Sequence, residues 1–169
     1  MHETPQDLAW LQRLLDASRA AAGPHLREVF ADGLALTAVE VAALMDGMRV
    51  VAVATVSATG EPVVAPVDGI LYRGRLHFGS SRDAVRTRHL AERPAVSATW
   101  IDGERHAVVV HGTAARVDLD DPDEAGFRAC LVELYAPRFG PGWIDWAASA
   151  AVYHRIEPRR MFASRLPEG

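Results

Sequence analysis

The residues best suited to chemistry lie in one short stretch that combines hydroxyl and guanidinium groups. Ser80 and Ser81 end an apolar segment, and Arg82 and Arg86 follow four residues apart. That spacing puts both arginines on one face of a helix. A strand that runs into a helix also presents unpaired N–H groups and partial positive charge. Serine and arginine both donate hydrogen bonds to phosphate oxygens, so the stretch predicts a phosphate-binding turn.

The same residues also fit a purely structural interpretation. Ser81 could cap a surface helix, and the arginines could form a solvated face paired with Asp83 and Glu92. Residue types and spacing are compatible with either role. The surrounding elements therefore decide between them.

Most of the surrounding elements are predicted to be strands. Valine-rich or alternating segments bounded by turn residues are 49–56, 62–71, 75–79, 95–101, 106–117 and 150–156. A short helix is expected over 82–91, after the third of these strands. Tight turns with only one inserted helix argue against repeated βαβ units and favour an antiparallel barrel or sandwich.

Helices are expected at both ends of this pattern. Thr4-Pro5 starts a helix that stops at Gly23-Pro24, and Thr37-x-x-Glu40 is a capping box for a second helix ending near Gly47. An acidic start at 120–124 opens a further helix, followed by a loop over 137–143. We therefore expect an N-terminal helical extension, residues 1–47, on one barrel domain, residues 48–169.

Composition limits the classes of protein that fit. The 169 residues suit one core, and a formal net charge of −4 makes a nucleic-acid partner unexpected. No apolar run reaches the roughly 20 residues of a membrane span, and no signal-peptide pattern opens the chain. Cys130 is the only cysteine, which excludes an internal disulfide. We expect a cytoplasmic protein without a membrane partner.

The order of these motifs resembles the pyridoxamine 5′-phosphate oxidase-like family of flavin-binding split barrels, which includes flavin- and deazaflavin-dependent oxidoreductases. The likeness covers residues 48–117 well and 152–163 more loosely. It is carried by Gly60-Glu61-Pro62, Ala65-Pro66-Val67, Gly74-Arg75-Leu76-His77-Phe78, Ser80-Ser81 with Arg86, Leu90, Pro94 and Val96, and Arg155-Ile156-Glu157-Pro158. The fold implied is α+β: a mainly antiparallel split β-barrel with added helices.

This resemblance implies a cofactor, either FMN or the deazaflavin coenzyme F-420. Ser80, Ser81 and Arg86 would meet its phosphate, with Arg82 as a helper. Main-chain atoms of Val64, Ala65, Pro66 and Val67 would lie along the ring system. A homodimer would complete the pocket, and hydride would pass to or from a small organic substrate. The cofactor performs that chemistry, so no catalytic side chain is assigned.

The sequence departs from the family pattern at several positions. Arg86 stands where lysine is common, and Asp68 follows Val67 where a bulky residue is common. Residues 159–163 lack the usual C-terminal aromatic, so vitamin B6 oxidation is not expected. Trp143, beside a Gly/Pro-rich loop with Trp146, could cover a ring-shaped ligand, or it could cap the core or a dimer contact.

Two other functions fit the same resemblance. One is a module that binds flavin without turnover. The other is haem binding or degradation, since related split barrels bind haem, with His77, His89 or His154 as the axial ligand. A metal site is not expected, because His106 and His111 are five apart on one strand and face opposite sides.

Overall fold

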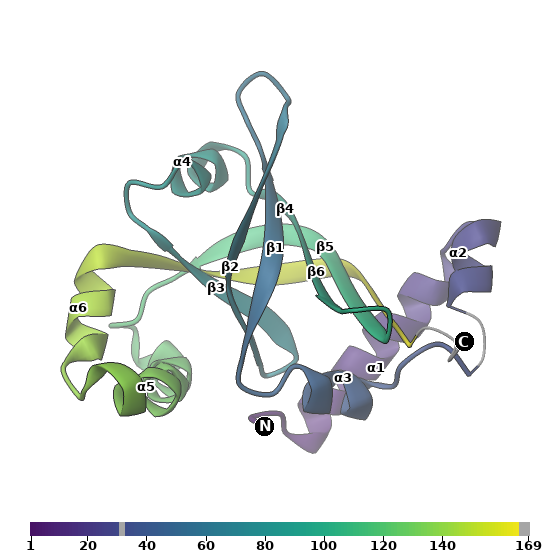
Figure 1. Ribbon diagram of the computed structural model, residues 1–169, viewed down its shortest axis with the longest axis horizontal. Coiled ribbons are helices and arrows are strands. Elements are labelled where there is room, and N and C mark those ends of the chain that lie inside the picture. Colours follow the sequence, from purple (N-terminus) through teal and green to yellow (C-terminus); the bar gives the residue numbers. More distant parts are fainter. Residues whose placement is uncertain (31–32, 166–169) are drawn as a thin grey trace.

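Six antiparallel strands close a barrel in the computed structural model, which describes residues 1–30 and 33–165 (Figure 1). Their order around the barrel is β1-β2-β3-β6-β5-β4. The strands are β1 (Met48–Val56), β2 (Pro62–Tyr72), β3 (Arg75–Ser81), β4 (Ala95–Asp102), β5 (His106–Val117) and β6 (Ala151–Arg165). The predicted α+β barrel is confirmed.

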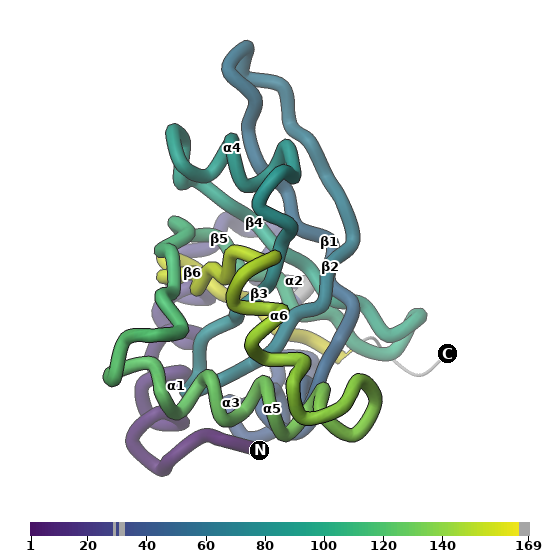
Figure 2. Tube along the Cα trace, turned by 90° about the vertical axis from the view of Figure 1, so that its left-hand side faces the viewer, coloured from purple at the N-terminus to yellow at the C-terminus, as the bar shows by residue number. Residues whose placement is uncertain are grey.

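Helices lie at three places around the barrel (Figure 1). The bounds are α1 (Pro5–Ala20), α2 (Pro24–Val29), α3 (Ala38–Leu44), α4 (Val85–Glu92), η1 (Pro122–Glu124), α5 (Ala125–Phe139) and α6 (Trp143–Ala150). Figures 1 and 2 both show α4 beside the β1–β2 hairpin, which projects beyond the barrel. None of the helices in the described part of the chain is long and apolar enough to span a membrane.

The N-terminal helices share the core of the barrel. The helix start predicted at Thr4 and the capping box predicted at Thr37 are confirmed for α1 and α3, and Thr4 also forms a capping box, with Asp7. Leu11 of α1 and Val41 of α3 are fully buried in the same cluster as the inward-facing strand residues. The Ser18 hydroxyl accepts a hydrogen bond from the Met161 N–H of β6 at 2.9 Å, which fixes α1 to the last strand.

Helices α5 and α6 cover the outer side of the barrel next to β3. Phe127 and Leu131 of α5 pack with Ile70 of β2 and Tyr153 of β6 in a second apolar cluster. Helix α5 continues through Pro137 to Phe139, and α6 begins at Trp143. The loop predicted over 137–143 is therefore wrong for its first three residues and for its last one. Pro137 lies inside α5, where it has no N–H to donate to the carbonyl of Glu133.

The last strand is longer than predicted, because a β-bulge accommodates Pro158. The register between β5 and β6 shifts from His111↔Arg160 to Gly112↔Pro158, which leaves Arg159 as the extra residue. A proline cannot donate to a strand ladder, and the predicted strand, 150–156, ends two residues before Pro158. Strand β6 instead continues to Arg165.

Gly112 permits the close approach of β6 at this bulge. A Cβ atom on Gly112 would lie 2.1 Å from the Glu157 carbonyl oxygen.

We expect Gly112→Ala to lower the free energy of unfolding by about 2–4 kcal/mol, because the backbone must move to relieve the overlap. Urea unfolding measures the change. Gly142→Ala, which has no atom within 4 Å of the added methyl group, is the control and should change stability by less than about 1 kcal/mol. An equal, small change in both variants would contradict the assigned packing.

Candidate functional site

The end of β3 and the first turn of α4 bring Ser80 and Arg86 together. The Arg86 Nε–H donates to the Ser80 hydroxyl at 2.7 Å, and Ser80 is almost fully buried. Arg86 is half-buried, and burial lowers the pKa of its guanidinium. Within the described residues, no carboxylate forms an ion pair with it. A half-buried cation without a counter-charge favours binding of an anion here.

Ser81 does not cap α4. The N-cap residue is Ala84, which offers no side-chain hydrogen bond. The Ser81 carbonyl accepts from the Thr87 hydroxyl at 2.8 Å and from the Ala84 N–H at 3.1 Å, so α4 is fixed to the end of β3 through the backbone. The Ser81 hydroxyl accepts only a long bond, 3.4 Å, from the Asp83 N–H. The capping interpretation of Ser81 is therefore wrong.

Arg82 is directed at α6 and not along α4. Its guanidinium donates to the carbonyls of Ser149 and Ala148, and its N–H donates to the Ala150 carbonyl at 3.2 Å. These are last-turn carbonyls of α6, where a cation satisfies both hydrogen bonding and the helix dipole. The expected shared helical face of Arg82 and Arg86 is wrong, because α4 begins only at Val85.

His154 and Arg116 add to this corner. His154 was considered only as a haem ligand, and no sequence pattern pointed to Arg116. On adjacent strands, Arg116 of β5 pairs with His154 of β6, which pairs in turn with Phe78 of β3. The His154 ring stacks on Phe78 at 5.4 Å between centroids, and its buried Nδ1 has no hydrogen-bond partner among the described residues. Burial and the charges of Arg116 and Arg86 lower the pKa of His154 to about 4. Strand register, invisible in the sequence, brings these residues together.

The predicted ring-binding segment, residues 64–67, lies where the β2–β3 ladder stops. Strands β2 and β3 pair from Tyr72↔Arg75 to Gly69↔Phe78. Before Gly69, β2 pairs only with β1, and after Phe78, β3 pairs only with β6. Among the described residues, each strand therefore has a free backbone edge beyond this point. The segment 64–67 and the pair Ser80-Ser81 lie on the two strands that separate here.

Side chains of this segment alternate between the barrel interior and its outer surface. Val67 pairs with Val51 and is buried, whereas Val64 is 61% exposed and Pro66 is also exposed. Ala65 is half-buried on the interior side. The outer surface of this segment is thus apolar.

Trp143 is connected to β2 through Tyr135. The two rings stack with centroids 4.4 Å apart, and the Tyr135 hydroxyl donates to Asp68 Oδ2 at 2.8 Å. Trp146, by contrast, is 62% exposed. Trp143 therefore begins α6 close to the residue that follows the segment 64–67. Its predicted role in covering a ligand stays a prediction.

The three histidines considered as haem ligands are buried or half-buried. His77 is buried against Phe127, with ring centroids 4.3 Å apart, and its Nδ1 lies 3.0 Å from the Arg75 carbonyl. His89 Nδ1 bonds to the Thr55 hydroxyl at 3.1 Å, and His154 is buried as described above. No group of three or more potential metal ligands occurs in residues 1–30 and 33–165.

The barrel and the point where β2 and β3 separate define the class of protein. It is a split barrel. The family model of pyridoxamine 5′-phosphate oxidase matches residues 38–165 of the chain. The chain belongs to this family. No curated protein sequence gives a significant match.

Solved structures share the fold. An FAD-binding protein from Mesorhizobium loti has a TM-score of 0.59 at 20% identity, with 80% of this chain and 100% of that chain covered. An F420 reductase has a TM-score of 0.55 at 20% identity, covering 71% and 94%. A haem storage protein from Vibrio cholerae has a TM-score of 0.57 at 23% identity, covering 69% and 86%. At these identities the likeness concerns the fold.

Burial of His77 links stability to pH. Desolvation lowers the pKa of His77 from 6.5 to about 3, so between these values the unfolded chain holds a proton that the folded chain lacks. The free energy of unfolding therefore falls as pH falls through this window. We expect wild type to lose about 2–3 kcal/mol more than His77→Phe between pH 7 and 4, measured by urea unfolding.

The exposed His25 supplies the control for this experiment. His25→Gln should keep the wild-type dependence of the free energy of unfolding on pH. If the free energy of unfolding of His77→Phe and of wild type changed equally with pH, folding would not prevent His77 from taking up a proton.

Proposed function

We propose that this chain is an oxidoreductase that binds FMN or the deazaflavin coenzyme F-420. The phosphate lies against Ser80, Ser81 and Arg86, and the ring system lies along the backbone of residues 64–67. The bound cofactor supplies hydride transfer to or from a small organic substrate. The observation that carries this proposal is the unpaired, half-buried Arg86, bonded to Ser80 where β2 and β3 separate.

The site's chemistry supports a phosphate-bearing flavin. A flavin carries an anionic end and a flat, largely apolar ring, and free backbone groups of β2 can bond to the polar edge of such a ring. Arg86 supplies a positive charge for the anionic end, and the exposed side chains of Val64 and Pro66 supply an apolar surface for the ring. Arg82 contributes indirectly in this proposal, by fixing α6 to the loop before α4. Membership of the family, and the FAD-binding and F420-reducing neighbours, support the same cofactor class.

We also propose a homodimer, formed through the outer surface of β1, β2 and β4. Val50 is 60% exposed, Val64 61% and Ile101 61%, and strand register places all three on the outside of the barrel. Exposed apolar side chains on one face can mark an interaction surface. Because Val64 belongs to the segment 64–67, a partner seated there would border the cofactor and enclose it. We further propose that the protein acts in the cytoplasm.

The direct test is cofactor binding by the purified full chain. Flavin or deazaflavin absorbance bands, or saturable binding of either compound in titration, are expected. Absence of both would contradict the proposal, and a Soret band after haem titration would favour haem binding. Steady-state reduction with nicotinamide donors or reduced deazaflavin then separates an oxidoreductase from a binding module without turnover.

Arg86→Ala should weaken cofactor binding by about 1.5–3 kcal/mol, because a hydrogen-bonded charge pair to the phosphate is lost. The dissociation constant from fluorescence titration measures this change. Arg13→Ala is the matched control, since Arg13 is an exposed arginine on α1, remote in sequence from α4. Unchanged affinity in Arg86→Ala would show that the phosphate binds elsewhere.

Ile101→Glu should convert the dimer to monomer, because a charge would be buried in the apolar interface. Sedimentation velocity gives the mass of each variant. Val39→Glu, at a site on α3 with a similar exposure of 57%, is the control and should leave the dimer intact. A dimer that persists in Ile101→Glu would exclude this surface.

A further inference from the structure

The β-bulge between β5 and β6 creates a basic cavity on the outside of the barrel. The cavity has a volume of about 570 Å³ and is lined by His111, Arg159 and Arg160. His111 pairs with Arg160 across the strands, and Arg159 is the residue that the bulge inserts. The extra residue therefore brings two consecutive arginines to the same cavity, where regular alternation would send them to opposite faces.

The two arginines lack counter-charges within the described residues. Both are exposed, and neither forms an ion pair there, although acidic residues outnumber basic ones in the chain, 22 to 18. Arginine presents donors in a planar fork that fits carboxylate and phosphate groups. Two such side chains around one cavity match the chemistry of an anion.

His111 completes the lining. Its Nδ1 lies 2.7 Å from the Ser97 hydroxyl of β4, which fixes the orientation of the ring. The second ring nitrogen is left for another partner, and a histidine nitrogen can donate to an anion. The cavity thus offers two guanidinium groups and one oriented imidazole.

A second large cavity contains arginines that are paired with carboxylates of the protein itself. It is about 480 Å³ in volume and contains Arg73, Arg75 and Arg155. Each of these three is paired with a carboxylate: Arg73 with Asp7 at 3.0 Å, Arg75 with Glu157 at 3.1 Å and Arg155 with Glu124 at 2.8 Å. That network is internally neutralised, whereas the arginines at the bulge are not.

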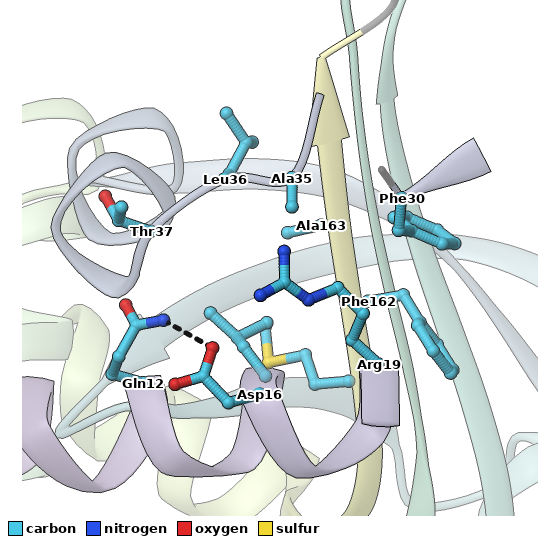
Figure 3. A pocket seen from close by; sticks show the side chains of 11 residues that line it. Gln12, Asp16, Arg19, Phe30, Ala35, Leu36, Thr37, Phe162 and Ala163 are labelled. Atoms are coloured by element: carbon cyan, nitrogen blue, oxygen red, sulfur yellow. Dashed lines mark hydrogen bonds between the residues drawn. The ribbon is translucent and has the colours of Figure 1, made fainter. Parts of the chain in front are cut away.

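The pocket of Figure 3 is of a different kind. It lies between α1, the segment before α3 and β6, and its volume is only about 140 Å³. Apolar side chains such as Phe30 and Phe162 line it, and Gln12 bonds to Asp16 at 3.0 Å across one side. Two arginines side by side, as in the cavity at the bulge, do not occur in its lining.

We propose that His111, Arg159 and Arg160 bind the anionic group, phosphate or carboxylate, of a small organic molecule. This site differs from the cofactor site of the same chain. Arg160 lies eight residues along β6 from Val152, the partner of Ser80. At 3.3 Å per residue the two positions are at most about 26 Å apart along the strand, and the bulge shortens this distance. The inference does not depend on flavin binding.

The experiment uses the full chain carrying Arg86→Gln, so that the proposed cofactor site contributes little to anion binding. Inorganic phosphate and succinate are titrated separately by isothermal calorimetry and by NMR of the His111 ring. Saturable binding with a shift of the His111 signals is expected. The stronger of the two probes identifies phosphate or carboxylate as the preferred group.

Adding Arg159→Gln and Arg160→Gln should weaken binding about 10- to 100-fold, since hydrogen bonds to a charged group are lost. Arg160→Gln alone should give a smaller loss. The control adds Arg13→Gln and Arg138→Gln, which remove the same charge from other exposed positions and should leave binding unchanged. Thermal unfolding verifies that every variant is folded.

Three results would overturn the proposal. The first is no saturable binding of either probe, and the second is an equal loss in the control. The third is binding by monomeric Ile101→Glu but not by the dimer, which would mean that carboxylates of a second copy occupy the arginines. Flavin titration of the chain with Arg86 intact is measured in parallel, so that failure of the cofactor proposal is recognised separately.

Discussion

The separation of β2 from β3 is the constraint on which the candidate site depends. A barrel strand normally satisfies its backbone groups on both edges, yet here the β2–β3 ladder ends at Gly69↔Phe78. Gly69 lies at this point because a Cβ atom there would be 2.7 Å from Val51 side-chain atoms. Beyond Gly69, β2 follows β1 into the projecting hairpin, while β3 turns into α4 (Figure 2). The free edges and Arg86 therefore arise from one divergence.

Two tertiary contacts hold the surroundings of this divergence in place. Arg82 bonds to the last turn of α6, and Tyr135 of α5 bonds to Asp68 of β2. Helices α5 and α6 are thus fixed to both of the separating strands. The resemblance implied Arg82 as a helper at the phosphate, and Asp68 departed from the family pattern beside the segment 64–67. The structure gives each a partner within the protein. Arg86, in contrast, bonds to the Ser80 hydroxyl and has no counter-charge among the described residues.

Local signals made most of the fold predictable. Thr4 and Thr37 cap helices as expected, and valine-rich segments with tight turns form the strands, because these effects act over a few residues. The predicted end of the last strand, before Pro158, was wrong. A bulge accommodates this proline, and the bulge depends on Gly112 of another strand. His154 and Arg116 were not foreseeable as neighbours of Arg86, since their proximity depends on the register of strands far apart in sequence.

The position of β6 has a consequence for how the chain folds during synthesis. This strand is made last, yet it pairs with β3 and β5, and its Met161 N–H bonds to Ser18 of α1. Helix α1 and the first five strands therefore leave the ribosome with the barrel still open. Closure requires contacts between residues more than 140 positions apart, an arrangement that slows folding and exposes strand edges meanwhile. Until β6 has been synthesised, β3 and β5 each keep an unpaired edge, and unpaired strand edges favour aggregation.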